Sequence, residues 1–334
     1  MKVRFAPSPT GSLHIGNALG AVVNRNFGGT LLLRIDDTDP ARNLPGGEEA
    51  ILADLRWLGI EWDEGPVRQS ERGERYREVA ARLPARFRGV QLLRPDGSAT
   101  YHLASVVDDI DFRITHVIRG NDHRPNEALH RALTEALGAT PPTYIHHGLV
   151  LGPDGKKLSK RSAGASIAAL REAGIPAEAV RRYLDELGLP RHDVRLDLAR
   201  IRSLAVEVIA SLPEEELAAR LGVPARVVPA LRGAHDLEEA RALAASILEP
   251  PPARVPAAGA DRATLVRLRE LRAEANGALG EERAKAIVGE LKAAGGDLRG
   301  VRRALTGRDS GPELWTVLVA LPRDETLRRI DAAL

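Results

Sequence analysis

The stretch FAPSPTGSLHIGN, residues 5–17, decides how the first part of the chain folds. The apolar run Val3–Ala6 is typical of a short strand, which the two prolines bring to an end. Gly11 lets the backbone turn, and the Ala-rich segment Gly16–Phe27 has helical periodicity. His14 is therefore expected at a helix N-terminus, where backbone N–H groups and the helix dipole favour a polyphosphate.

The rest of the chain extends this pattern into two regions. Strands alternate with amphipathic helices up to about residue 160. This predicts an α/β fold, a Rossmann-like nucleotide-binding domain with a parallel sheet that binds ligands at the carboxyl ends of its strands. Further strands are expected at 30–35, 114–118 and 144–151, and helices at 48–58, 70–83 (with Ser70 as N-cap) and 126–137. After about residue 165 the pattern predicts an all-α C-terminal region, with the Pro-rich residues 249–256 linking two helical subdomains.

Composition excludes several classes of protein. The 334 residues carry a formal net charge of +2, so overall charge neither requires nor excludes a nucleic-acid partner. There are no cysteines, which excludes disulfides, Cys-ligated zinc and thiol catalysis. The N-terminus has no signal-peptide pattern and no apolar run reaches the length of a membrane span, so we expect a cytoplasmic protein without a membrane partner.

A second motif, KKLSKR at residues 156–161, follows a predicted turn at 152–155. Lys157 and Lys160 in a Gly-flanked loop can neutralise the charge that builds up on a transferring phosphate. Alone, such a run is more often a solvated basic loop, and the segment around His14 is about as often an ordinary helix start as a phosphate site. Together they indicate ATP-driven activation of a carboxylate.

The two motifs occur in this order in a known family. The chain resembles class I aminoacyl-tRNA synthetases and, within them, glutamyl-tRNA synthetases. Residues 14–17 (HIGN) stand where the family has its HIGH motif, and residues 157–161 (KLSKR) stand where it has KMSKS. Further matches lie at residues 34–39, 57–59, 63–66, 69–72, 101–109 and 115–120, and residues 303–307 and 311–314 resemble the end of the family's anticodon-binding domain.

The resemblance implies roles for individual residues. The catalytic residues would be His14, Lys157 and Lys160. ATP would be bound by Pro7, His14, Gly16, Asn17, Asp122, Leu149, Leu158, Ser159 and Lys160. Glutamate would be bound by Arg4, Ala6, Ser8, Asp36, Tyr101, Ser105 and Arg119. A planar guanidinium suits bidentate contact with a carboxylate, as required of Arg4 and Arg119, and Asp36 would receive the substrate ammonium group.

The resemblance also implies a division of the chain. It gives a catalytic domain over residues 1–165, a stem-contact-like helical segment over 166–200 and an anticodon-binding-like domain over 201–334. The family inserts roughly a hundred residues, including any zinc ribbon, between the halves of its nucleotide fold, and here only residues 84–97 span that gap. Positioning of the tRNA acceptor end must therefore be weaker or use other surfaces.

Three substitutions depart from the family pattern. Asp36 replaces a Glu, Ser105 replaces an Asn, and Asn121 replaces a Glu. Asn121 removes a negative charge close to the expected binding site, which leaves strict glutamate specificity open.

The resemblance implies a monomeric glutamate-tRNA ligase that uses ATP and Mg²⁺, without zinc, to join L-glutamate to the 3′ end of tRNA-Glu. Two alternatives remain open. A paralogue could transfer the activated amino acid to a modified tRNA base, an amine or a carrier protein, as the missing insert suggests. A non-catalytic RNA-binding protein on the same scaffold would not need to retain His14, Gly16, Lys157 and Lys160.

Overall fold

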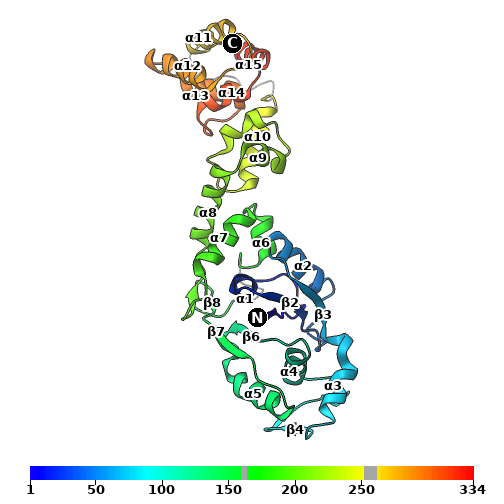
Figure 1. Cartoon of the computed structure of the whole chain (residues 1–334). Helices are drawn as coiled ribbons and strands as arrows, with labels where there is room; N and C mark the ends of the chain where they lie inside the picture. Colours follow the sequence, from blue (N-terminus) through cyan, green and yellow to red (C-terminus); the bar gives the residue numbers. More distant parts are fainter. Residues whose placement is uncertain (159–163, 252–261) are drawn as a thin grey trace. The chain divides into compact units, whose positions relative to one another are not determined.

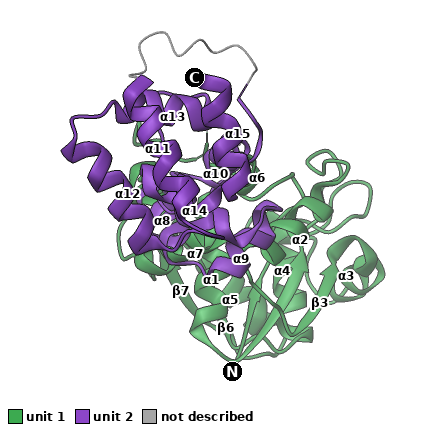
Figure 2. Ribbon diagram, turned by 90° about the horizontal axis from the view of Figure 1, so that it is seen from above, with its two compact units in different colours: residues 1–172, 177–201 green, residues 173–176, 202–334 purple. Residues whose placement is uncertain are grey.

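The computed structural model describes residues 1–158, 164–251 and 262–334. The chain divides into two compact units, coloured green and purple in Figure 2. The first comprises residues 1–172 and 177–201, and the second comprises residues 173–176 and 202–334. Within the described ranges, no helix combines the length and the apolar character that a bilayer span requires.

Parallel strands form the centre of the first unit (Figure 1). β1 (Lys2–Phe5), β2 (Thr30–Ile35) and β3 (Glu64–Arg68) form a three-stranded sheet, and β6 (His116–Gly120) and β7 (Thr143–His147) form a two-stranded one. β2 lies between β1 and β3, and β6 pairs with β7. The backbone N–H of Thr115 donates to the carbonyl of Lys2 at 3.0 Å, which places the start of β6 beside β1. The chain thus reverses its strand order between β1 and β6, where open α/β sheets bind ligands.

Helices connect these strands. They are α1 (Ile15–Phe27), α2 (Gly47–Trp57), the 3₁₀ turn η1 (Gln69–Arg72), α3 (Gly73–Ala80), α4 (Tyr101–Asp111), the 3₁₀ turn η2 (Asn121–Asn126) and α5 (Glu127–Ala136). The unit ends with β8 (Val150–Leu151), α6 (Ile167–Glu172), α7 (Ala177–Leu187) and β9 (Val194–Arg195), which pairs with β8, before α8 (Leu198–Ser211) leads into the second unit. The predicted α/β fold is confirmed.

Two local predictions were wrong. Ser70 is not a helix N-cap, because its backbone N–H and Oγ donate to Asp37 at 2.7 and 2.6 Å. Residues 69–72 consequently form a 3₁₀ turn, and α3 begins only at Gly73. The expected strand 144–151 is interrupted at Gly148, whose backbone lies so close to the carbonyl of His192 that an added Cβ would stand 1.9 Å from its oxygen.

The short bridge over residues 84–97 is an ordered structure. β4 (Arg86–Phe87) and β5 (Val90–Gln91) form a hairpin, and Leu93 bridges to Ala99 in a second reversal of the chain. Phe87 and Leu93 pack against an apolar cluster that α3 and α4 contribute. The bridge therefore connects α3 to α4 and covers part of the core.

The second unit is helical over its described residues, as predicted, although the region after residue 165 also contains the short strand β9, which belongs to the first unit. It contains the end of α8, α9 (Glu214–Leu221), the 3₁₀ turn η3 (Ala225–Leu231), α10 (Leu237–Leu248), α11 (Arg262–Glu274), α12 (Glu281–Ala293), α13 (Leu298–Thr306), α14 (Leu314–Ala320) and α15 (Arg323–Ala333). Most of the predicted linker 249–256 lies outside the described residues.

A buried ionic network joins β2 to α4. The Arg34 side chain, 1% exposed, donates to Asp36 at 2.6 Å and to Asp109 at 3.0 Å, and lies 3.7 Å from Asp108. Arg4 on β1 adds a contact to Asp109 at 3.4 Å. Asp108 in turn accepts hydrogen bonds from Gln69, Arg72 and Tyr76 at 2.8 to 3.0 Å. Buried charges need such partners, since an unpaired charge in the interior is strongly destabilising.

A histidine pair joins α4 to α5. Nδ1 of His102 lies 3.0 Å from Nε2 of His130, and His130 is buried. Burial, reinforced by the charge of Arg119, lowers the pKa of His130 to about 2. The ring is therefore neutral in the folded protein at any ordinary pH.

We predict that Arg34→Met lowers the free energy of unfolding by about 3–5 kcal/mol, because three buried carboxylates lose their shared cation. Urea denaturation followed by circular dichroism measures this loss. Arg82→Ala, which breaks an exposed pair with Glu78, is the control and should cost less than about 1 kcal/mol. Equal effects of the two substitutions would contradict the structural role of Arg34.

His130 should also make stability depend on pH. The unfolded histidine binds a proton below about pH 6.5, whereas the folded one does not, so acidification favours unfolding. The expected loss attributable to His130 is about 1.4 kcal/mol for each pH unit below 6.5. Urea unfolding at pH 7, 6 and 5 should show a shallower decline for His130→Gln, with no such change for the exposed His192→Gln. Equal slopes in wild type and His130→Gln would refute this.

Candidate active site

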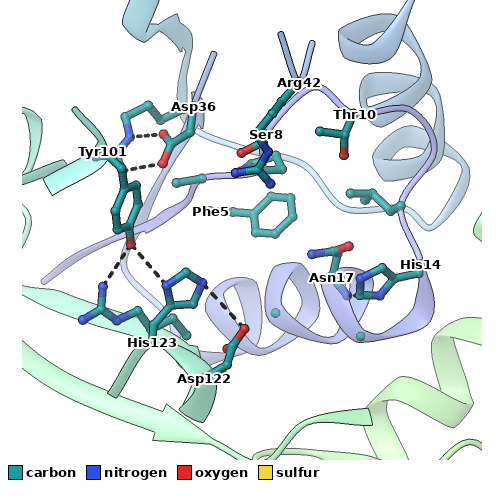
Figure 3. A pocket seen from close by; sticks show the side chains of 18 of the residues that line it. Phe5, Ser8, Thr10, His14, Asn17, Asp36, Arg42, Tyr101, Asp122 and His123 are labelled. Atoms are coloured by element: carbon teal, nitrogen blue, oxygen red, sulfur yellow. Dashed lines mark hydrogen bonds and ion pairs between the residues drawn. The ribbon is translucent and has the colours of Figure 1, made fainter. Parts of the chain in front are cut away.

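A cavity of about 760 Å³ opens at the carboxyl ends of β1, β2 and β6. Its wall brings together most of the residues singled out from the sequence, as Figure 3 shows for part of the set. From those sets the lining includes Arg4, Ala6, Pro7, Ser8, His14, Gly16, Asn17, Asp36, Tyr101, Arg119, Asp122, Leu149, Lys157 and Leu158. The side chains come from both halves of the sheet, so the strand-order reversal does form a binding crevice.

His14 stands at the start of α1, as its sequence context predicts. It is the N-cap residue, and its Nδ1 accepts the backbone N–H of Asn17 at 3.2 Å (Figure 3). This bond leaves the ring proton on Nε2, the form in which a neutral imidazole can donate to a phosphate oxygen. Gly16 leaves room for the ring, because an added Cβ would lie only 3.1 Å from it.

Asp54 of α2 stabilises the turn before His14 through two hydrogen bonds. Its Oδ2 accepts the Ser12 hydroxyl at 2.6 Å and the Leu13 backbone N–H at 2.8 Å. Asp54 is fully buried, and burial raises the pKa of its carboxyl although the two hydrogen bonds oppose this. Its Oδ1 lies 3.6 Å from Arg171 of α6, so a single carboxylate contacts both motif regions.

The segment after the Lys-rich loop returns to the same turn. The N–H of Ile15 donates to the Ala165 carbonyl at 2.9 Å, and the N–H of Ile167 donates to the Leu13 carbonyl at 2.8 Å. The hydroxyl of Ser12 accepts the N–H of Ala168 at 3.1 Å. The opening motif is therefore joined by hydrogen bonds to residues 165–168, which follow the second motif in the sequence.

The entry to the Lys-rich loop also lies at the cavity. Lys157 forms an ion pair with Asp122, which follows β6. Burial works to raise the pKa of Asp122, but the hydrogen bond and charge of Lys157 outweigh it and lower that pKa. An added Cβ at Gly120 would lie 2.6 Å from an oxygen of Asp122, so that side chain would have to move. Ser159, Lys160 and Arg161 lie outside the described residues.

Arg119 at the end of β6 is a second buried arginine, and its contacts differ from those of Arg34. Its side chain donates to the Tyr101 hydroxyl at 3.3 Å and lies over the ring of Tyr144. Arg119 is 8% exposed, and burial lowers the pKa of its guanidinium. Within the described ranges no carboxylate lies within 4.0 Å of it, and its Nη2 has no hydrogen-bond partner.

Asp36 faces the same part of the cavity (Figure 3). Both of its oxygens accept from Arg34, at 2.6 and 3.2 Å. Burial raises the pKa of the Asp36 carboxyl, and the charge of Arg34 offsets this only in part. Each carboxylate oxygen retains a second lone pair, so Asp36 can accept from a further cation as well.

Two residues noted from the sequence do not reach the cavity. Ser105 is buried behind Arg34, whose Nη2 lies 3.5 Å from its Oγ, and it is not part of the lining. The side chain of Asn121 points to Asp193, to which it donates at 2.9 Å. The departure at Asn121 thus alters a contact at the start of η2 rather than the charge of the cavity wall.

The lining contains polar residues that sequence reasoning missed. Thr10, Arg42, Asn43, Arg94 and His123 all contribute to it. Nδ1 of His123 lies 3.3 Å from the Tyr101 hydroxyl. Thr10 stands within the opening motif and could have been found there, whereas Arg42 and Arg94 lie in connections without a distinctive pattern. Across the described ranges, no group of three or more His, Asp or Glu residues could hold a metal ion.

Comparison with known proteins agrees with this geometry. The profile of a family described as tRNA synthetases class I (E and Q), catalytic domain, matches residues 1–86 and 85–204. Glutamate--tRNA ligase 1 of Rubrobacter xylanophilus is 36% identical over 423 aligned positions, covering 100% of this chain and 97% of that protein. Glutamate--tRNA ligase of Akkermansia muciniphila is 32% identical over 426 positions, covering 99% and 98%.

The alignments also bear on the length of the chain. The first extends over 423 positions and the chain has 334 residues, so at least 89 positions (423 less 334) fall opposite gaps in it. The family profile matches in two pieces that meet at residues 85–86, inside the short bridge.

A solved structure shows the same fold. The glutamate tRNA ligase from Elizabethkingia meningosepticum matches with a TM-score of 0.75 and 23% identity, covering 100% of this chain and 99% of that one. The family profile covers more than half of the chain, and the relatives align over nearly all of it. The chain therefore belongs to the glutamyl-tRNA synthetase family of class I aminoacyl-tRNA synthetases.

Proposed function

We propose that this protein activates L-glutamate with ATP and transfers it to the 3′ end of tRNA. The observation that carries the choice of amino acid is Arg119, a buried guanidinium without a carboxylate partner among the described residues. A buried charge is unfavourable until it is paired, so the site is suited to a ligand that brings its own carboxylate. A glutamate side chain does this, whereas the amide of glutamine does not.

The cavity offers a consistent place for each group of the substrates. Arg119 and Tyr101 receive the side-chain carboxylate, and Asp36 receives the ammonium group. Arg4, whose Nε lies 3.4 Å from Asp109 without forming a hydrogen bond to it, lies at the same wall, and we assign its guanidinium to the second carboxylate. His14, Asn17 and the backbone at the start of α1 face the triphosphate, whose oxygens bring Mg²⁺ as its counter-ion.

Activation needs no side-chain nucleophile in this arrangement. An oxygen of the α-carboxylate attacks the α-phosphorus of ATP, the bond to the β-phosphate breaks, and pyrophosphate leaves. Lys157, together with Lys160, offsets the negative charge on the departing phosphates. Lys157, which pairs with Asp122 in the structure, would exchange that partner for a phosphate oxygen.

Transfer completes the reaction. The terminal ribose hydroxyl of the RNA attacks the carbonyl of glutamyl adenylate, an ester forms, and AMP leaves. We assign the stem-contact role to the helices over residues 166–200 and the anticodon-binding role to the domain over residues 201–334. The short bridge favours one alternative, transfer to an acceptor other than the tRNA 3′ end. Residues 84–97 replace the segment that holds the acceptor end in the family.

One experiment separates these possibilities. The purified chain is incubated with ATP, labelled glutamate and unfractionated tRNA, and acid-precipitable label and ATP–pyrophosphate exchange are both measured. The proposal expects both signals, with the label lost when the RNA 3′ diol has been destroyed by periodate. Label that survives periodate would indicate a modified base as acceptor. Exchange without precipitated label would indicate a small or protein acceptor, and the absence of both signals would indicate a non-catalytic protein.

Arg119→Leu should raise the KM for glutamate by about 10²-fold or more, since the charge-assisted hydrogen bonds to the side-chain carboxylate are lost. The KM for ATP should change little. Because the buried cation has no carboxylate partner in the described part of the chain, the same substitution should not lower the urea midpoint of unfolding. Loss of stability with an unchanged KM for glutamate would show that Arg119 is structural.

The loop prediction concerns Lys160. Lys160→Ala should lower the rate of glutamate-dependent pyrophosphate exchange by about 10²-fold, because it removes stabilising charge from the transition state. Lys156→Ala, an exposed lysine in the same loop, is the matched control and should stay within a few-fold of wild type. Equal behaviour of the two variants would remove Lys160 from the mechanism.

A further inference from the structure

The bridge over residues 84–97 carries an excess of positive charge over negative charge. It holds three arginines, Arg86, Arg88 and Arg94, against the single carboxylate of Asp96. Asp96 accepts the backbone N–H and the hydroxyl of Ser98 at 2.9 and 2.6 Å, so its carboxylate stabilises the turn at residues 96–98. Within the described part of the chain, no carboxylate lies within 4.0 Å of any of the three arginines.

The hairpin directs two of these arginines to solvent. Arg86 pairs with Gln91 and Phe87 pairs with Val90, so Arg88 and Gly89 form a two-residue turn. Phe87 packs against the core, and the alternation of a strand then leaves Arg86 on the opposite, exposed side. Arg88, also exposed, has a φ of 48°, in the left-handed region where such turns prefer Asn, Asp or Gly. The backbone thus does not favour arginine at this position.

The hairpin also lies close to the cavity. Arg94 lines the cavity wall and is held there by the carbonyls of Thr38 and Ala99, at 2.9 and 2.6 Å. Arg94 follows Gln91 by three positions in the sequence, so their Cα atoms are at most about 11 Å apart. Arg86 lies opposite Gln91 at about 5 Å. The Cα of Arg86 is therefore about 16 Å or less from that of Arg94, which lines the cavity.

We propose that Arg86 and Arg88 form a phosphate-binding surface for the acceptor end of RNA, in place of the insert that this chain lacks. The inference rests on the proposed transfer to RNA and names the surface that the transfer uses. A net charge of +2 gives the whole molecule little attraction for a polyanion, so local unpaired arginines must supply it. Contacts to phosphates position an RNA without reading its sequence. Such contacts are therefore suited to holding the 3′ end of a tRNA at the cavity.

The test uses the double variant Arg86→Gln/Arg88→Asn in the full chain. Asn suits the left-handed turn, so the hairpin should fold as in wild type. The matched control is Arg113→Asn, since Arg113 is likewise exposed with a φ of 56° and no carboxylate within 4.0 Å in the described ranges. Arg113 precedes β6, whereas the cavity lies at the carboxyl end of that strand.

Binding of unfractionated tRNA is measured across a range of salt concentrations. The double variant should bind roughly tenfold more weakly at low salt, with a slope of log K against log salt that is smaller by roughly one for each arginine removed. Glutamate-dependent pyrophosphate exchange should remain within about twofold of wild type, and Arg113→Asn should match wild type throughout. A double variant with the wild-type slope overturns the inference, whether or not RNA is charged.

Failure of the proposed function gives a different result. If the wild type shows hairpin-dependent tRNA binding but no acid-precipitable glutamate, the transfer step is wrong and the binding surface is supported. If glutamate is joined to RNA equally well by wild type and double variant, at the same KM for tRNA, the function stands and the hairpin surface is wrong.

Discussion

The pairing of Arg34 with the carboxylates of Asp36, Asp108 and Asp109 is the interaction on which the site depends. These groups come from β2 and α4, and Arg4 joins them from β1. In the interior, each charge is stable only while its partners keep their positions. The network therefore fixes α4 against the sheet, and with it Tyr101 at the start of that helix. The floor of the cavity is preorganised before any substrate binds, as tight recognition of a small charged ligand requires.

Two buried arginines near this floor have opposite roles because their surroundings differ. Arg34 is surrounded by carboxylates, whereas Arg119 meets Tyr101, Tyr144 and His146 and no carboxylate within the described ranges. The first contributes to the stability of the fold, and the second is complete only with an anionic ligand. Asp54 adds a second constraint, since it holds the turn of His14 and contacts the helix that follows the Lys-rich loop. The position of His14 is therefore fixed before the reaction, which needs both motifs, begins.

Much of the fold and part of the site could be predicted from the sequence. The helix start at His14 was predictable because prolines, a glycine and helical periodicity follow one another within residues 5–27. Side-chain direction was not. Ser105 stands in a matching motif, yet its position on α4 turns it toward Arg34, and Asn121 turns toward Asp193, which is distant in sequence. Ser70 has the composition of an N-cap, but Asp37 engages it. Contacts such as these depend on tertiary neighbours, which local pattern does not specify.

Selection of a carboxylate over an amide is the property of the cavity from which the proposed substrate follows. The most direct measurement is ATP–pyrophosphate exchange by the wild-type chain with L-glutamate or L-glutamine as the only amino acid. The account predicts exchange with glutamate and a kcat/KM for glutamine lower by about 10²-fold or more, because the amide leaves the buried Arg119 unpaired. Comparable exchange with the two amino acids, or faster exchange with glutamine, would contradict it.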